Sequence, residues 1–495
     1  MPSHFFDAIV VGDDTAGLVA GTLLARRGYR VMQVDCGTVP GSYFLDGYPF
    51  PCGPSLLPPI EGSRVMTEIM RELALSGQTY HGLGLPVSRL QTLLPGHRLD
   101  IWHDRAMFVR ELHREFPRKK SLVDVALSEQ DELANQTAGF LSQFPALPPL
   151  GFWEGRRLGR EAARFPDVIR GHGVPRAIRE DGVLLRALCS PVDFVAMSEG
   201  SLAHPAGAHA LAATLRGGWQ VAPSREKLKA MFKKRLRELG GILLPGPKPA
   251  RLDANGSRLC GMTLTDSTHT YNCANVLAAA PVSEIAGLVP DGRRARKVAA
   301  LMPAVEPRLC AMTINLVAPA SAVPQGMGPA VFLAGDPASD GEVSPVFVAA
   351  FPVVRNKVAQ RDELLLSASM IVAKARLRKD RARTIAELKA ELLGRMARPF
   401  PFVVEKAAII STPYDAERMS DTPGQPLPPD RYQPPDLCRT AGKLAWGLCA
   451  LPATAGFENL FFASRQSFPG LGTEGEFFAG CTIANHVTRL NPKKA

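Results

Sequence analysis

Residues 12–17, GDDTAG, form a turn in which two glycines bracket two adjacent carboxylates. The apolar residues 9–11 before the turn predict a buried strand, and the residues after it predict a helix that ends at Gly28. Gly12 suits a tight turn, and Gly17 lets the helix lie close to the strand. These are two of the three glycine roles in a dinucleotide-binding turn. We therefore expect this turn to bind a phosphate-bearing ligand at the start of a helix.

An acidic residue ends the next predicted strand. The run YRVMQVD finishes at Asp35, about 20 residues after the turn, where an acid can accept hydrogen bonds from ribose hydroxyls. Taken alone, Asp35 is equally well explained as a solvated acid in a turn, but within this strand–turn–helix–strand unit we favour the ribose role. The residues expected to frame the ligand here are Gly12, Asp14, Thr15, Ala16, Gly17 and Asp35.

Two aspartates stand where a phosphate would lie. Asp14 takes the place of the second glycine of the pattern, and Asp13 precedes it. A carboxylate beside a phosphate costs several kcal/mol, on the order of Coulomb energies near a protein surface. Three explanations remain open: the side chains point to water, Arg26, Arg27 or a distant basic residue neutralises them, or the site holds no dinucleotide.

Two further blocks carry structural signals. Residues 224–241 place Leu228, Met231, Phe232, Leu236 and Leu239 on one helical face, with Ser224 as the cap and Gly240-Gly241 as the stop. Short strands are expected around 242–252, 258–265 and 269–272, and NCANVLAAAP predicts a buried strand. The tail after Glu458 predicts a strand, a glycine-rich turn and a helix, which is a second place for an anion.

Composition narrows the class of protein. The chain has 495 residues, 46% of them hydrophobic, which is enough for more than one domain. No apolar run is long enough to span a membrane, and the N-terminus has no secretory pattern. Nine cysteines without a CxxC pair indicate free thiols in a reducing cytoplasm. His204 and His209 lack a third ligand, so we expect no metal site.

Three separated segments resemble one family. They are the first strand–turn–helix–strand unit, the stretch PGSYFLDGYPFPCGPSLL and the closing PGLGTEGEFFAG. Together they are similar to the FAD-dependent phytoene desaturase and retinol saturase group, within the flavin amine oxidase and Rab GDP-dissociation-inhibitor superfamily. The resemblance implies FAD as the cofactor. It adds these cofactor-binding residues: Gly41, Ser42, Gly470, Gly472, Glu474 and Gly475.

The chain also departs from the family pattern. Besides Asp14, the family's Gly-Gly-Arg becomes Pro40-Gly41-Ser42, so its basic residue is missing. The Asp of the following run becomes Pro51, and Glu476 stands where a small or apolar residue is usual. Three of these changes remove affinity for an anion or add negative charge.

The resemblance implies an α/β fold with two domains. A discontinuous Rossmann-like FAD-binding domain of the GR2 type would comprise residues 1–75, 205–285 and 440–495. An α+β substrate domain would comprise residues 76–204 and 286–439. A proline-rich segment, residues 413–435, is expected to be a connecting loop, with a cover over a substrate entrance as the alternative.

The function implied is that of an FAD-dependent oxidoreductase, similar to a desaturase or saturase. Hydride would pass through the flavin to or from an apolar, isoprenoid or polyene substrate. We nominate no catalytic residue, because in such proteins the cofactor performs the chemistry. The alternative is a binding or chaperone-like protein that keeps the fold and lacks the flavin, as the Rab-inhibitor branch suggests.

The formal net charge of +11 comes from several short basic clusters, at 114–120, 293–297 and 374–383. Solvated helix faces explain them best. Attraction to an anionic membrane surface is the functional reading, with peripheral docking that would suit an apolar substrate. Nucleic acid is not expected as a partner, because no binding motif accompanies the charge.

Overall fold

The computed structural model describes residues 5–36, 41–244, 246, 248–265, 269–335, 344–355, 358–378, 380–414, 420–422, 425–426, 432–440 and 444–493. Its first sheet has seven strands in the order β11-β2-β1-β14-β13-β12, and β23 also pairs with β14. The parallel strands are β1 (Phe5–Gly12), β2 (Val31–Val34), β11 (Ile242–Leu244), β14 (Thr270–Ala279) and β23 (Leu460–Phe462). The antiparallel edge consists of β12 (Pro249–Asn255) and β13 (Arg258–Leu264).

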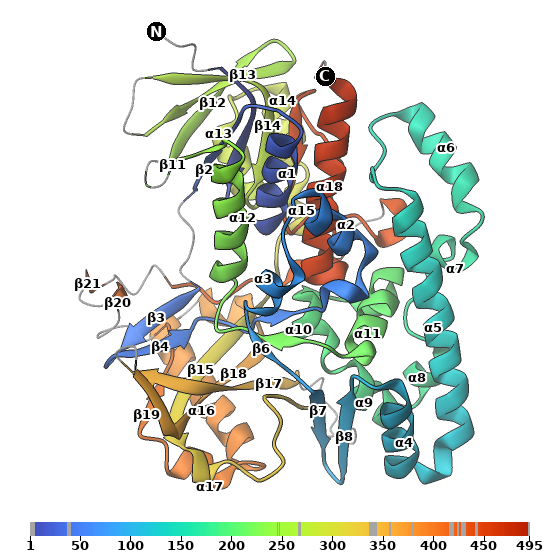
Figure 1. The fold of residues 1–495 in the computed structure, drawn as a ribbon, viewed down its shortest axis with the longest axis vertical. Coiled ribbons are helices and arrows are strands. Elements are labelled where there is room, and N and C mark those ends of the chain that lie inside the picture. Colours follow the sequence, from blue (N-terminus) through green and yellow to red (C-terminus); the bar gives the residue numbers. More distant parts are fainter. Residues whose placement is uncertain are drawn as a thin grey trace.

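Helices cover both faces of this sheet (Figure 1). Ala8 and Val10 of β1 face α1 (Thr15–Arg26), α12 (Glu226–Glu238) and α18 (Gly472–Leu490). Ile9 and Val11 face the opposite layer, formed by α13 (Val282–Leu288), α14 (Arg293–Ala299) and α15 (Met302–Val305). The sheet is therefore buried on both sides, which explains why its strands are almost continuously apolar.

Most of the elements expected from the sequence are present. The strand–turn–helix–strand unit is confirmed, and so is the strand, turn and helix of the tail. Leu228, Met231, Phe232 and Leu236 of α12 are buried, and Leu239 packs against the same core. The cap of α12 was placed one residue early: Arg225 is the N-cap residue, and the Ser224 hydroxyl only accepts a long bond from the Glu226 N–H (3.4 Å).

Two glycines let α1 pack very closely against its neighbours. A Cβ atom on Gly17 would lie 2.1 Å from the Cβ of Ala279 in β14, so only glycine lets the helix come this close to the sheet. This close packing is the role of the third glycine in the dinucleotide-binding pattern. A Cβ on Gly480 would lie 2.5 Å from the carbonyl oxygen of Ala16. The start of α1 therefore lies directly against the middle of α18.

A second large sheet occupies the other half of the molecule (Figure 1). Its strand order is β19-β15-β18-β17-β16-β7-β8. The bounds are β7 (Arg89–Leu94), β8 (His97–Trp102), β15 (Leu309–Pro319), β16 (Ala330–Leu333), β17 (Val346–Arg355), β18 (Val358–Ala373) and β19 (Ile409–Ser411). Leu388 and Leu392 of α16 (Arg381–Ala397) pack in the core that includes this sheet. The α/β fold class, with a Rossmann-like sheet and a second α+β part, is confirmed.

A helical region flanks the second sheet. It contains α4 (Arg105–Glu115), α5 (Lys120–Gln143), α6 (Phe152–Ala162), α7 (Pro166–Ile169), α8 (Arg176–Glu180), α9 (Gly182–Cys189), α10 (Val192–Ala196) and α11 (Pro205–Arg216). Within the described ranges, no helix is both long and apolar enough to cross a membrane. Of the proline-rich segment, β20 (Ser420–Thr422) and β21 (Gln425–Pro426) join β3 (Ser42–Leu45) and β4 (Tyr48–Pro51) in a small sheet. Residues 415–419, 423–424 and 427–431 of it lie outside the described residues.

Candidate functional site

A cavity of about 630 Å³ opens at the carboxyl ends of β1, β2 and β14. Ligands of α/β sheets bind at this edge, and the volume is within the usual range for ligand pockets. The cavity is bordered by the starts of α1 and α18, so segments from the two ends of the chain share one wall. Six of the residues expected to hold a ligand line it: Gly12, Asp14, Thr15, Asp35, Gly41 and Gly472.

The other six predicted site residues lie behind the wall or beside it. Ala16 and Gly17 are buried between α1 and its neighbours, and Ser42 begins β3. Gly470 and Gly475 allow close packing, because a Cβ would lie 2.6 Å from the Cβ of Ala206 and 2.3 Å from the carbonyl oxygen of Phe468, respectively. This close packing fixes the position of the turn from which Gly472 lines the cavity.

Glu474 has a structural set of partners. The Ser63 hydroxyl donates to one carboxylate oxygen (2.6 Å), and Nε2 of the buried His209 is bonded to the other (2.8 Å). These contacts hold the pKa of Glu474 below its usual value although burial opposes them. In the part of the chain that the structure describes, no three His, Cys, Asp or Glu side chains are grouped to hold a metal ion.

Distant lysines neutralise Asp13. The buried Asp13 carboxylate lies 3.0 Å from Nζ of Lys229 and 3.6 Å from Nζ of Lys233, both on α12. Lys233 also lies 3.8 Å from Asp35. Of the three explanations for this acid, neutralisation by a distant basic residue is the one the structure supports for Asp13.

Arg26 and Arg27 do not take part in that neutralisation. The Arg27 guanidinium forms an ion pair with Glu72 (2.7 Å), and Arg26 donates to the carbonyl oxygen of the same residue (3.2 Å). Both arginines lie at the C-terminal end of α1, and the aspartates lie in the turn before its N-terminal end. The length of the helix therefore separates these arginines from the turn. Residues close to the turn in sequence were therefore the wrong candidates.

The negative charge of Asp14 is less well compensated than that of Asp13. Its Oδ2 accepts a hydrogen bond from the backbone N–H of Arg465 (3.1 Å), in the loop after β23. Burial raises the pKa of Asp14 to about 6, with Glu476 adding to the rise and Arg465 opposing it. The Asp14 carboxyl group thus lies at the N-terminal end of α1, in an environment that favours its neutral form.

Asp14→Asn is expected to stabilise the protein at pH 8 by roughly 3 kcal/mol. The native state holds the Asp14 proton up to about pH 6, whereas the unfolded chain releases it near the ordinary value of 3.8. Stability therefore falls as pH rises between these two values, and the whole loss is present at pH 8. Urea unfolding of the two proteins at pH 8 and pH 5 measures the gain, which should shrink at pH 5.

Asp13→Asn is the matched control. Its carboxylate is paired with Lys229 and Lys233. Removing this charge leaves the buried Lys229 ammonium group only its longer contact with Glu226 (3.5 Å), so the change should lower stability at pH 8. Equal effects of the two neighbouring substitutions would contradict the different environments described for Asp13 and Asp14.

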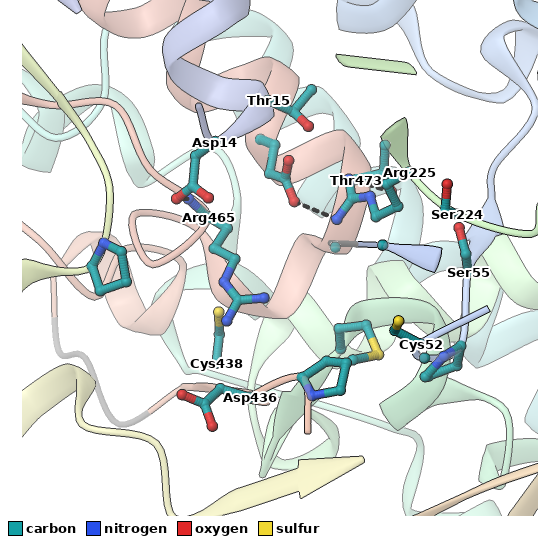
Figure 2. A pocket seen from close by; sticks show the side chains of 18 of the residues that line it. Asp14, Thr15, Cys52, Ser55, Ser224, Arg225, Asp436, Cys438, Arg465 and Thr473 are labelled. Atoms are coloured by element: carbon teal, nitrogen blue, oxygen red, sulfur yellow. Dashed lines mark hydrogen bonds and ion pairs between the residues drawn. The ribbon is translucent and has the colours of Figure 1, made fainter. Parts of the chain in front are cut away.

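Arg465 is a cation that the sequence analysis missed. Figure 2 shows its side chain extending from the backbone beside Asp14 towards Cys438 and Asp436. Within the described ranges the guanidinium has no hydrogen bond or ion pair, while Asp436 is paired with Lys374 (2.7 Å). Arg465 lies in the loop after β23, far along the chain from the turn, and no local sequence pattern marks it as a partner of that turn.

Glu476 is compensated by a second missed residue. Arg225, which precedes α12, forms an ion pair with the buried Glu476 carboxylate (2.7 Å) and donates to the Thr473 hydroxyl (3.3 Å). The dashed line in Figure 2 marks the ion pair. Arg225 thus joins the start of α12 to the first turn of α18 along the cavity wall.

Part of the cavity lining is apolar. It includes Leu56, residues 194–197 at the end of α10, and Leu377. Cys52, Cys310 and Cys438 also line the cavity, and burial raises the pKa of Cys438 to about 11. Such thiols stay protonated at neutral pH, so they behave as apolar side chains rather than as nucleophiles. All nine cysteines are free.

Comparison with known proteins gives a fold and no closer relationship. No family model matches the chain, and no curated protein matches it. An oxidoreductase from Methanosarcina mazei is similar in structure, with a TM-score of 0.60 and 12% identity over 97% of this chain and 99% of that one. Cyclohexylamine oxidase from Brevibacterium oxydans IH-35A has a TM-score of 0.56 and 15% identity over 99% and 100%.

A putrescine oxidase bound to putrescine is similar to the same degree, with a TM-score of 0.55 and 16% identity over 99% of this chain and 100% of that one. At these identities the likeness establishes the fold. The chain therefore has, over almost its whole length, the fold of these oxidoreductases.

Proposed function

We propose that the protein is a flavin-dependent oxidoreductase that holds FAD in the cavity between the starts of α1 and α18. The observation that carries the proposal is the convergence of three distant segments on that one cavity. Gly12 and Asp35 of the first segment, Gly41 of the second and Gly472 of the closing segment all line it. The fold shared with known oxidoreductases supports the proposal.

The donor set of the cavity suits FAD. The first N–H groups of α1 have no partner within the helix, and this helix start lies on the cavity wall beside Thr15. Arg465 offers a guanidinium for a diphosphate, and Asp35 lies at the end of β2 where a ribose would bind. Asp14 and Glu284 are acids of the wrong sign in this lining, and burial raises the pKa of both carboxyl groups, which reduces that conflict.

The cofactor would supply hydride transfer, and the chain would supply position and exclusion of water. Arg465, Asp35 and the α1 turn would hold the anionic and ribose parts. Leu56 and the end of α10 would surround the reactive part with apolar side chains. This lining favours an apolar substrate, and the sequence resemblance favours an isoprenoid or polyene related to desaturase or saturase substrates.

A flavin-less binding protein is the second candidate. The observation that favours it is Asp14, whose carboxylate stands beside the helix start where a phosphate would lie. In that case the same cavity would hold an apolar ligand without performing redox chemistry on it.

Purification is expected to give a yellow protein with a flavin absorption spectrum, or a colourless one that becomes yellow when FAD is added. The released cofactor should be identified as FAD after denaturation. Reconstitution should be tried at pH 6 and at pH 8, because protonated Asp14 favours an anion. A colourless protein that takes up no FAD at either pH would contradict the proposal and favour the binding protein.

A further inference from the structure

Helix α6 exposes an aromatic pair on the outside of the molecule. Phe152 and Trp153 are 74% and 75% exposed, and their ring centroids lie 5.4 Å apart in an edge-on arrangement. The opposite face of the helix is anchored, because Leu158 and Ala162 are buried in a core cluster. Figure 1 shows α6 at the outer edge, beside α5 and away from the two large sheets.

Arginines continue the exposed face of α6. Arg156, Arg160 and Arg164 are exposed and follow Trp153 at intervals of three and four residues, which places them along one side of the helix and just beyond its end. None of the three guanidinium groups has a hydrogen-bond or ion-pair partner among the described residues.

Nearby acids do not cancel this positive charge. Glu154 is paired with Arg489 (2.8 Å), and Glu161 is paired with Arg157 (2.7 Å). The exposed face of α6 therefore combines two exposed aromatic rings with three guanidinium groups that form no ion pair among the described residues.

We propose that α6 docks the protein onto an anionic lipid surface. At a membrane surface, aromatic side chains lie at the boundary between the lipid headgroups and the acyl chains, and arginines beside them bind the anionic headgroups. Each such charge contributes through the negative potential of the surface, and the aliphatic part of arginine can lie along the apolar layer. The complementary charge makes an anionic membrane the occupant rather than a neutral one.

The basic clusters noted in the sequence are less suited to this role. Arg114 is paired with Glu111 and Glu115, and Lys119 is paired with Asp181. In the cluster at 374–383, three of the basic residues have acidic partners. The cluster at 293–297 lies on α14, whose residues include no aromatic side chain.

The test uses the full-length protein and sedimentation with vesicles. Wild type should bind vesicles of phosphatidylcholine with phosphatidylserine, and bind much less to phosphatidylcholine alone. Arg156→Gln/Arg160→Gln/Arg164→Gln should lower the affinity about 100-fold, and Phe152→Ser/Trp153→Ser should also lower it strongly. Trp153 is exposed, so tryptophan emission should shift to the blue on binding in wild type and not in the serine variant.

The matched control removes the same charge elsewhere. Arg293→Gln/Arg294→Gln/Arg296→Gln on α14 should leave vesicle binding nearly unchanged. Equal losses of vesicle affinity in the two arginine triple variants would overturn the proposal. A wild-type protein that does not bind the anionic vesicles would also overturn it. Self-association that the serine variant abolishes, without vesicle binding, would show a second copy as the occupant and would also overturn it.

Discussion

Arg225→Ala is expected to lower the free energy of unfolding by about 3–5 kcal/mol, because it leaves a buried carboxylate without its partner. Glu476 is only 5% exposed and pairs with Arg225 at 2.7 Å. The arginine also donates to Thr473, so the change releases the first turn of α18 from the start of α12. Urea unfolding at pH 8, followed by tryptophan fluorescence, measures the loss.

Two controls separate the buried pair from a general effect of removing an arginine. Arg225→Ala/Glu476→Gln should recover much of the lost stability, because the uncompensated charge is gone. Arg64→Ala breaks an exposed pair with Glu68 that is also 2.7 Å long, with both side chains largely in water. It should change stability very little. A loss in Arg64→Ala as large as in Arg225→Ala would show that the burial of Glu476 is not the cause.

Arg465→Gln is expected to weaken FAD binding about 100-fold, which corresponds to about 2.7 kcal/mol. Its guanidinium makes no hydrogen bond or ion pair with another described side chain, and it lies in the cavity with the start of α1. In the proposed FAD site, this charged donor would take the place of the basic residue that the chain lacks at Ser42. Titration of the apoprotein with FAD, followed by flavin fluorescence, measures the affinity.

Lys374 provides the matched control. It lines the same cavity, but its ammonium group is paired with Asp436 at 2.7 Å, so Lys374→Gln should change FAD affinity much less. Arg465→Lys keeps the charge without the planar fork and should fall between wild type and Arg465→Gln. If wild type binds FAD and Arg465→Gln binds it equally well, only the role of Arg465 is contradicted. If wild type binds none, the cofactor proposal itself fails.

Local patterns were sufficient to predict the elements of the first sheet. Apolar strands, the helix on either side of Gly17 and the amphipathic face of α12 depend on residues within one or two helical turns of each other. Their order along the chain agreed with the α/β class that the family resemblance implied, and the structure confirms this class. The strand and glycine turns of the tail were predicted for the same reason.

The sequence by itself therefore determined the strand–turn–helix units and the glycines that let them pack closely. The tertiary structure alone decided how the charges at the turn are balanced. Lys229 lies 216 residues from Asp13, and Arg465 lies 451 residues from Asp14, so no local pattern could pair them. Likewise, the packing of Leu158 and Ala162 against the core shows that the opposite face of α6, which carries Trp153 and the arginines, is exposed to solvent. Electrostatic and surface properties depend on distances in space, and those distances exist only once the chain is folded.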